Sequence, residues 1–342
     1  MCDYIGSKRK LTPWIFEEIL RSVGSSNLSG HMLVDACSGS GWVSREAAGL
    51  GAEVVAGDLM ALSGIMVEGS IGVDRKTIAI ARKIIPELNA LRPIRGYFYE
   101  NYSPAGGRKY MTCENAERLD AMRDAIDVAS GENEKLRKYL LYCLLESFSR
   151  VMNTSGHTVS FLKQFKDRAL DRMLLRMEEV YPGKATFVLG DVVKTVGSSA
   201  CASRKKKVLY MDPPYNDRQY GNNYHLYETI VRNDKPSIPP VGESICGYRN
   251  WRDESKSGFC SRDEGKVLAL MAEVVSNADP DVAFMSYSSD STCGRDEIVS
   301  TFESRGYSVE THSKQQARYN GHKDGVVNVS PLREYLFEVR PG

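Results

Sequence analysis

The chain has 342 residues and a net charge of +1 at pH 7, with 42% hydrophobic and 26% charged residues. These totals are ordinary for a globular protein and predict about two domains, or one large domain with an insertion. The near-neutral charge excludes a global attraction to nucleic acid, no run is apolar enough to span a membrane, and eight cysteines without C-x-x-C spacing predict reduced thiols in a cytoplasmic protein that holds no metal.

The first part of the chain predicts an amino-terminal helix and then a β-loop-α-β unit. Apolar residues at helical spacing predict the helix over residues 11–22. A strand over 32–35 then runs into the glycine-rich turn Ala36-Cys37-Ser38-Gly39-Ser40-Gly41. A helix over about 43–50 and a strand over 53–56, which ends near Asp58, complete the unit.

Residues 74–182 have the pattern of a helical insertion. Apolar residues recur at helical intervals over 114–127 and 134–152, and a further helix is predicted over 166–180. Strand patterns resume after the insertion. The remaining predicted elements are strands at 186–191, 208–211, 282–287, 307–311 and 334–339, a helix at 294–304, and loops at 195–203 and 232–262.

The glycine-rich turn indicates a nucleoside-binding site. Gly39 and Gly41 permit close approach of a ligand to the backbone, and Asp58 at the end of the second strand can accept hydrogen bonds from ribose hydroxyls. The third glycine of a dinucleotide fingerprint is missing, and no lysine follows as in a phosphate-binding P-loop. The pattern therefore favours an adenosyl ligand without pyrophosphate; the alternative is a purely structural turn.

The tetrapeptide Asp212-Pro213-Pro214-Tyr215 ends the apolar strand at 208–211. Two prolines cannot continue a strand ladder, so an acid and an aromatic ring are fixed at the strand's carboxyl end. An acidic acceptor, carbonyl acceptors and a ring suit a planar base with an exocyclic amino group. The alternative is an Asp-capped turn beside a buried tyrosine.

Several ordered motifs together resemble the D12 class of N6-adenine-specific DNA methyltransferases. They are Tyr4-Ile5-Gly6-Ser7-Lys8-Arg9-Lys10-Leu11, Asp35-Ala36-Cys37-Ser38-Gly39-Ser40-Gly41, Asp58, Gly190-Asp191 and Asp212-Pro213-Pro214-Tyr215. The resemblance implies an α/β fold with the Rossmann-like sheet of S-adenosylmethionine-dependent methyltransferases, largely parallel with one antiparallel strand near the carboxyl end. Residues 1–73 and 183–342 would form the catalytic domain, and residues 74–182 a helical target-recognition insertion.

The resemblance also implies a set of cofactor-binding residues. They are Tyr4, Ile5, Gly6, Ser7, Lys8, Asp35, Cys37, Ser38, Gly39, Ser40, Gly41, Asp58, Leu59, Asp191, Val192 and Asp212. The amino-terminal group would lie near the methionine end of S-adenosylmethionine, although Lys8 could instead contact a phosphate. Asp191 would accept from the cofactor's adenine amino group; the alternative is a helix cap. Cys37 departs from the family, which usually has an aromatic residue there.

Catalysis would use Asp212, Pro213, Pro214 and Tyr215 to bind the target adenine. Asp212 and a nearby backbone carbonyl would accept the hydrogens of the amino group, and Tyr215 would stack on the base. Lys10, Arg218, Tyr220, Tyr224, His225 and Arg318 are the expected contacts to double-stranded DNA. An RNA adenine-N6 methyltransferase and a catalytically silent DNA-binding subunit stay open as alternatives, as do the oligomeric state, a stand-alone or phage origin, and a cognate restriction endonuclease as partner.

Overall fold

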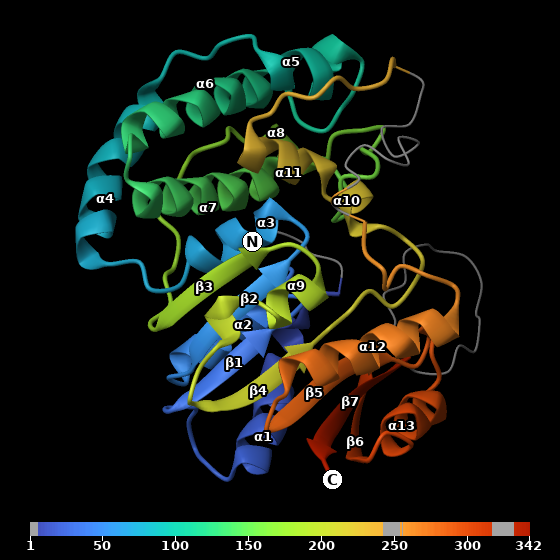
Figure 1. Cartoon of the computed structure of the whole chain (residues 1–342). Coiled ribbons are helices and arrows are strands. Elements are labelled where there is room, and N and C mark those ends of the chain that lie inside the picture. The colour runs from blue at the N-terminus through green and yellow to red at the C-terminus, as the bar shows by residue number, and fades with distance from the viewer. Residues whose placement is uncertain (1–5, 242–253, 255, 317–331) are drawn as a thin grey trace.

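The computed structural model describes residues 6–241, 254, 256–316 and 332–342. Within that part of the chain, the centre is a seven-stranded sheet with the strand order β3-β2-β1-β4-β5-β7-β6 (Figure 1). The strands are β1 (His31–Asp35), β2 (Glu53–Asp58), β3 (Lys184–Leu189), β4 (Lys206–Met211), β5 (Val282–Ser288), β6 (Tyr307–Gln316) and β7 (Leu332–Pro341). Each predicted strand is confirmed, and the largest extension is at the carboxyl end of β6.

The sheet is parallel except for β7, which pairs antiparallel with both β5 and β6. This arrangement confirms the prediction of a largely parallel sheet with one antiparallel strand near the carboxyl end. The strand order reverses between β1 and β4, because the chain continues from β1 to β2 on one side and from β4 to β5 on the other. Ligands of open α/β sheets bind outside the carboxyl ends of the strands at such a point.

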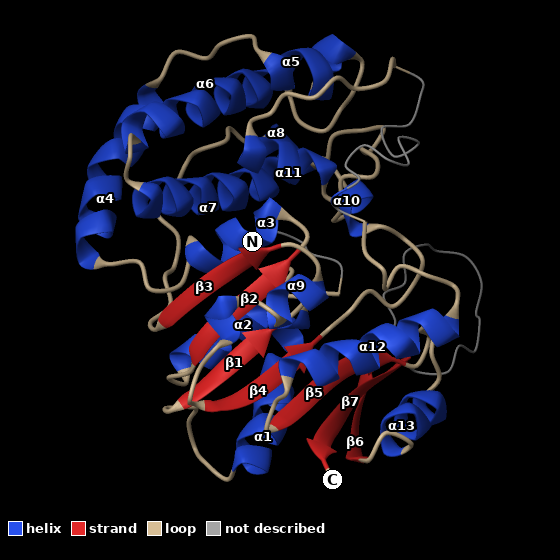
Figure 2. Cartoon of the chain, viewed as in Figure 1, coloured by secondary structure: helices blue, strands red, loops and turns tan. Residues whose placement is uncertain are grey.

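Helices cover both faces of the sheet, as Figure 2 shows. One face packs against α1 (Thr12–Val23), α2 (Trp42–Gly49) and part of α3 (Ala61–Glu68), and the other against α9 (Val192–Val196), α12 (Glu264–Ala278) and α13 (Arg295–Glu303). Successive strand residues point to opposite faces, so Leu209 joins the second core and its neighbour Tyr210 joins the first. Burial on both faces explains the continuous apolar runs of β4 and β5.

A separate helical body lies above the sheet in Figure 1 and contains most of the predicted insertion. Its helices are α4 (Arg75–Ala90), α5 (Tyr97–Tyr102), α6 (Cys113–Ser130), α7 (Glu134–Val151), α8 (Asp167–Leu170), α10 (Tyr220–Asn223) and α11 (His225–Arg232). Elsewhere along the chain and within this body, short 3-10 helices occur at η1 (Lys8–Lys10), η2 (Pro104–Gly106) and η3 (Ser199–Cys201). Helices α10 and α11 follow the Asp212 turn in the chain. Its core therefore joins the insertion to α3 and to the segment just beyond that turn.

The helix predicted over 166–180 is wrong beyond α8, because the chain is extended there. Side chains from neighbouring helices replace the helical hydrogen bonds. Asn115 Oδ1 accepts from Met173 N at 2.8 Å. Asn89 donates to Leu175 O at 2.8 Å and accepts from Leu175 N at 2.9 Å. The side chains of Met173 and Leu175 are both buried and lie two residues apart, which is the spacing of an extended, strand-like segment.

The described residues also bear on membrane crossing and on thiol chemistry. No helix among them is long and apolar enough to cross a membrane. Cys37, Cys113, Cys143, Cys201, Cys260 and Cys293 are free thiols in the described part of the chain.

Candidate active site

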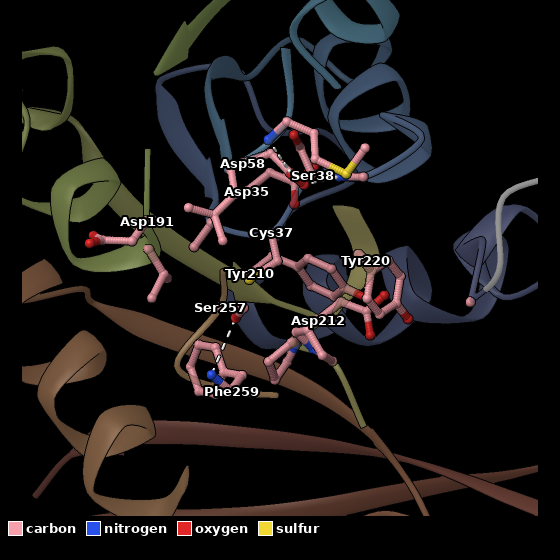
Figure 3. Close-up of a pocket in the computed structure, with 18 of the residues that line it drawn as sticks. Asp35, Cys37, Ser38, Asp58, Asp191, Tyr210, Asp212, Tyr220, Ser257 and Phe259 are labelled. Carbon is pink, nitrogen blue, oxygen red and sulfur yellow. Dashed lines mark hydrogen bonds between the residues drawn. The ribbon is translucent and has the colours of Figure 1, made fainter. Parts of the chain in front are cut away.

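A cavity of about 250 Å³ opens at the carboxyl ends of β1, β2 and β4, where the strand order reverses. Figure 3 shows Cys37 near its centre, with Asp212 and Tyr220 on one side and Asp191 on the other. The lining comes from residues 6–8, 35–40, 42–43, 58–60, 190–193, 210, 212–215, 220, 256–259 and 270. Of the predicted cofactor residues that the structure describes, all but Gly41 belong to this lining.

The glycine turn after β1 is held in a shape that depends on its glycines. Gly39 and Gly41 have φ values of 46° and 74°, in the left-handed region that favours glycine. Gly39 N donates to Asp58 Oδ2 at 2.9 Å, and Gly41 N donates to Ser38 O at 2.7 Å. Gly41 begins α2, and a Cβ there would lie 3.1 Å from Val67 Cγ2. Gly41 therefore shapes the glycine turn without lining the cavity itself.

Asp35 ends β1 with a buried carboxyl group that faces the cavity. Ser44 Oγ donates to Asp35 Oδ2 at 2.6 Å. No group in the described part of the chain donates to Asp35 Oδ1 or contacts Ser38 Oγ by a hydrogen bond, although both atoms are buried. Burial, opposed by the Ser44 hydrogen bond, raises the pKa of Asp35 to about 7. These two atoms are unsatisfied acceptors that a ligand with donor groups would complete.

Asp58 and Asp191 each perform a structural task at the cavity wall. Besides holding Gly39, Asp58 accepts from Met60 N at 3.0 Å through Oδ1, and burial raises its pKa to about 6. Asp191 caps α9 by accepting from Lys194 N at 2.7 Å, which is the alternative that the sequence left open. Its side chain is exposed and lines the cavity. Both carboxylates retain lone pairs for a ligand.

The Asp212–Tyr215 turn leaves β4 at Met211 and enters the cavity wall, as predicted. Tyr215 Oη donates to Asp212 Oδ1 at 2.7 Å, and its ring packs edge-on against Tyr287 with centroids 5.1 Å apart. Burial raises the pKa of Asp212; Lys8 opposes this shift and Glu334 adds to it. The hydroxyl of Tyr215 is thus tied to the acid, while the ring stays at the cavity.

Lys8 lies between the carboxylates of Asp212 and Glu334. Its Nζ is 2.9 Å from Asp212 Oδ1 and 2.9 Å from Glu334 Oε1, and its side chain is 6% exposed. Burial lowers the pKa of Lys8, but the two carboxylates outweigh burial, and the pKa is raised. Lys8 also contacts Tyr215 Oη. Its neighbour Ser7 reaches the glycine turn, 3.3 Å from Ser40 Oγ; the predicted Tyr4 and Ile5 lie outside the described residues.

The predicted DNA contacts divide into accessible and buried residues. Lys10 and Arg218 are exposed, and Tyr220 lines the cavity. The prediction is wrong for Tyr224 and His225, which are 0% and 1% exposed in the helical body and face no solvent. His225 packs near the aromatic core, and its Nδ1 lies 3.2 Å from Thr158 Oγ1. The remaining predicted contact, Arg318, lies outside the described residues.

Sequence reasoning missed several residues of the site. Phe259 and Ser257 line the cavity from the segment before α12, and the side-chain amide of Gln219 binds the Ser257 backbone at 2.8 and 3.3 Å. The polar 232–262 stretch contains no local signal for Ser257 or Phe259, because the hydrogen bonds to Gln219 join residues that are far apart in the sequence. Glu334 was also missed, although a glutamate at the inward position of an alternating strand is a signal that sequence contains.

Comparisons with known proteins agree with this geometry. The model of the D12 class N6 adenine-specific DNA methyltransferase family matches residues 4–240. The chain is 30% identical over 313 residues to the type II methyltransferase M.NlaIII of Neisseria lactamica, covering 89% of this chain and 88% of that protein. It is 29% identical over 339 residues to the type II methyltransferase M.CviAII of Paramecium bursaria Chlorella virus 1, covering 98% and 97%. It is 32% identical over 355 residues to the type II methyltransferase M.FokI of Planomicrobium okeanokoites, covering 98% of this chain and 52% of that protein.

The family match covers the insertion and also the amino-terminal lysine segment, the glycine turn and the Asp212 turn, which line the cavity. The chain belongs to the D12 class N6 adenine-specific DNA methyltransferase family and is an enzyme that methylates adenine in DNA.

Proposed function

We propose that this enzyme transfers the methyl group of S-adenosylmethionine to N6 of an adenine that has left the DNA duplex and entered the cavity. The observation that carries the proposal is the shared cavity. The glycine turn, Asp35 and Asp58 lie in the same lining as Asp212 and Tyr215. A donor held by the first group would therefore be close to a base held by the second.

The chemistry of the cradle fits S-adenosylmethionine. Asp35 Oδ1 and Ser38 Oγ are buried acceptors that the described residues leave unsatisfied, and the cofactor carries an ammonium and two ribose hydroxyls. Asp58 would accept from the ribose and Asp191 from the adenine amino group, each with the lone pairs that its structural role leaves free. Phe259 and Val192 offer apolar surface for the adenine ring. When bound, the cofactor supplies an electrophilic methyl group on its sulfonium.

Asp212 would make the adenine amino group nucleophilic. The lone pair of that nitrogen is delocalised into the ring, so the planar amino group attacks poorly. A hydrogen bond from the amino group to Asp212 favours a pyramidal nitrogen and lets the carboxylate take the proton as the new bond forms. Holding the two reactants in line supplies much of the rate, and such positioning is worth on the order of 7–11 kcal/mol.

Tyr215 would help to retain the extrahelical base. Its ring stays at the cavity while its hydroxyl is tied to Asp212. Base–aromatic stacking is worth about 1–3 kcal/mol per base, which offsets part of the unstacking from the duplex. The exposed Lys10 and Arg218 would contact the phosphates on either side.

We further propose that residues 74–182 recognise the target sequence and that a cognate restriction endonuclease accompanies the enzyme. The helical body stands beside the cavity and is joined to it through α10 and α11. The relatives are named type II methyltransferases and modification methylases, names that belong to restriction–modification systems. Most of the aromatic residues of the segment, such as Phe98, Tyr102 and Tyr110, are buried in its core, so exposed polar residues would read the DNA.

The direct test is mass spectrometry of nucleosides from duplex DNA incubated with the protein and methyl-labelled S-adenosylmethionine. Labelled N6-methyldeoxyadenosine is the expected product. A structured RNA is digested in parallel. Label only in the RNA would overturn the DNA substrate, and no label in either nucleic acid despite cofactor binding would mean a catalytically silent subunit.

A further inference from the structure

Glu334 belongs to the active site although it lies on the last strand, more than a hundred residues after the Asp212 turn. It sits near the start of β7, which pairs with β5, and is 3% exposed. Its Oε1 accepts from Tyr215 Oη at 2.6 Å and from Ser286 Oγ at 2.7 Å, and lies 2.9 Å from Lys8 Nζ. A buried carboxylate persists only when it is paired, and these three donors supply the pairing.

Glu334 and Asp212 share the ammonium of Lys8 and compete for the hydroxyl hydrogen of Tyr215. Lys8 Nζ is 2.9 Å from both carboxylates, and Tyr215 Oη is 2.7 Å from Asp212 and 2.6 Å from Glu334. A phenol has one hydrogen to donate, so Tyr215 serves one carboxylate at a time. Lys8 has three ammonium hydrogens and can donate to both carboxylates at once, whereas the one hydroxyl hydrogen of Tyr215 is withdrawn from Asp212 whenever it is donated to Glu334.

We propose that Glu334 is a positioning residue that holds Lys8 and the hydroxyl of Tyr215 while Asp212 receives the adenine amino group. The inference rests on the proposed function, because it takes Asp212 as the acceptor. Without Glu334, both donors would bind Asp212 alone. The lone pairs of Asp212 would then be occupied by Lys8 and Tyr215 when the base arrives, and the Asp212 carboxylate would be a weaker proton acceptor.

The electrostatic part of this role has a definite sign. The titratable groups that face Glu334 are Lys8 from η1, Tyr210 from β4, and Asp212 and Tyr215 from the turn. Its negative charge raises the pKa of Asp212, while Lys8 lowers it. Removing the charge of Glu334 therefore lowers the pKa of Asp212 and moves the acid limb of the kcat–pH profile to lower pH.

The test compares Glu334→Gln with Glu338→Gln in single-turnover methylation of duplex DNA over a range of pH. Glu338 is a matched control, because it is a buried glutamate on the same strand and face that accepts from Ser22 and Arg340 and not from Lys8 or Tyr215. A charge-assisted hydrogen bond is worth about 1.5–3 kcal/mol, so kcat of Glu334→Gln should fall roughly 10- to 100-fold. KM for S-adenosylmethionine should stay within about twofold, and the acid limb should move to lower pH.

A purely structural role would give a different pattern. It would lower the melting temperature and scale kcat equally at every pH, and that result would overturn the proposal, as would a wild-type kcat and profile in Glu334→Gln. Glu334→Asp keeps the charge and should bring the acid limb back towards that of the wild type; failure to do so counts against the proposal. This variant also serves if the glutamine variant does not fold.

Asp212→Asn in the same assay separates the two claims. If Asp212→Asn retains the wild-type rate, the proposed role of Asp212 fails and the inference about Glu334 fails with it. If Asp212→Asn is inactive while Glu334→Gln behaves like the wild type, only the positioning role of Glu334 is overturned.

Discussion

Affinity for S-adenosylmethionine should depend on pH through Asp35. Its pKa is raised to about 7 by burial, and its Oδ1 faces the cavity without a donor from the described residues. We expect the positively charged ammonium of the cofactor to be the donor to this oxygen, and therefore to bind the ionised form of Asp35. Binding then weakens by the factor 1 + 10^(pKa − pH), which is about 11 at pH 6 and about 1.3 at pH 7.5. Cofactor Kd should therefore fall roughly eightfold between these values, with release of up to about one proton at the lower pH.

Isothermal titration calorimetry in two buffers of different ionisation enthalpy measures both the affinity and the released protons. Asp35→Asn has no carboxyl group to titrate at this position, so it should bind more weakly but with a much flatter pH dependence. Asp58, whose pKa is raised to about 6, adds a change of only about twofold at pH 6. A wild-type Kd that stays constant within twofold from pH 6 to pH 7.5 would refute the reasoning.

Three further substitutions test other parts of the account. Glu228→Ala removes a buried carboxylate that accepts from Ala61 N and Leu62 N at 2.9 Å each. Because these buried donors would then be unsatisfied, the free energy of unfolding measured by urea titration should fall by roughly 2–4 kcal/mol. A loss below about 1 kcal/mol would contradict this expectation. Tyr215→Ala should slow methylation less on a mismatched target adenine, where flipping costs less, and an equal loss on paired and mismatched targets would argue against stacking. Arg218→Ala should weaken DNA binding about equally for all sequences and reduce the slope of log K against log salt by about one; an unchanged slope would exclude a phosphate contact.

The parts of the site that could be predicted from sequence are those that local physics fixes. An apolar run that stops at two prolines places Asp212 at the end of a strand, and glycine favours the positive φ values that the turn adopts at Gly39 and Gly41. Parallel pairing of β1 with β2 and β4 then brings these strand ends to one edge of the sheet. The strands of the sheet and the edge at which the cavity opens follow from patterns of this kind, whereas the antiparallel strand was expected from the family resemblance.

The parts that could not be predicted depend on tertiary contacts. Tyr224 and His225 follow the Asp212 turn closely and were expected to contact DNA, but they are buried because α11 packs into the helical body. The segment after α8 has apolar residues in a helical window, yet asparagine side chains of α4 and α6 hold it extended. Glu334 reaches the active site only because β7 is inserted between β5 and β6.

The central claim is that Asp212 accepts the adenine amino hydrogen, and the most direct measurement compares Asp212→Ala with the wild type in two assays on the same preparation. The assays are single-turnover methylation of duplex DNA and calorimetric binding of S-adenosylmethionine. A positioned acid or base contributes roughly 10²- to 10⁴-fold to rate, so we expect the variant to lose at least about a hundredfold in methylation while its cofactor Kd changes only a few-fold. Methylation at the wild-type rate, or a loss explained wholly by failure to bind the cofactor, would contradict the account.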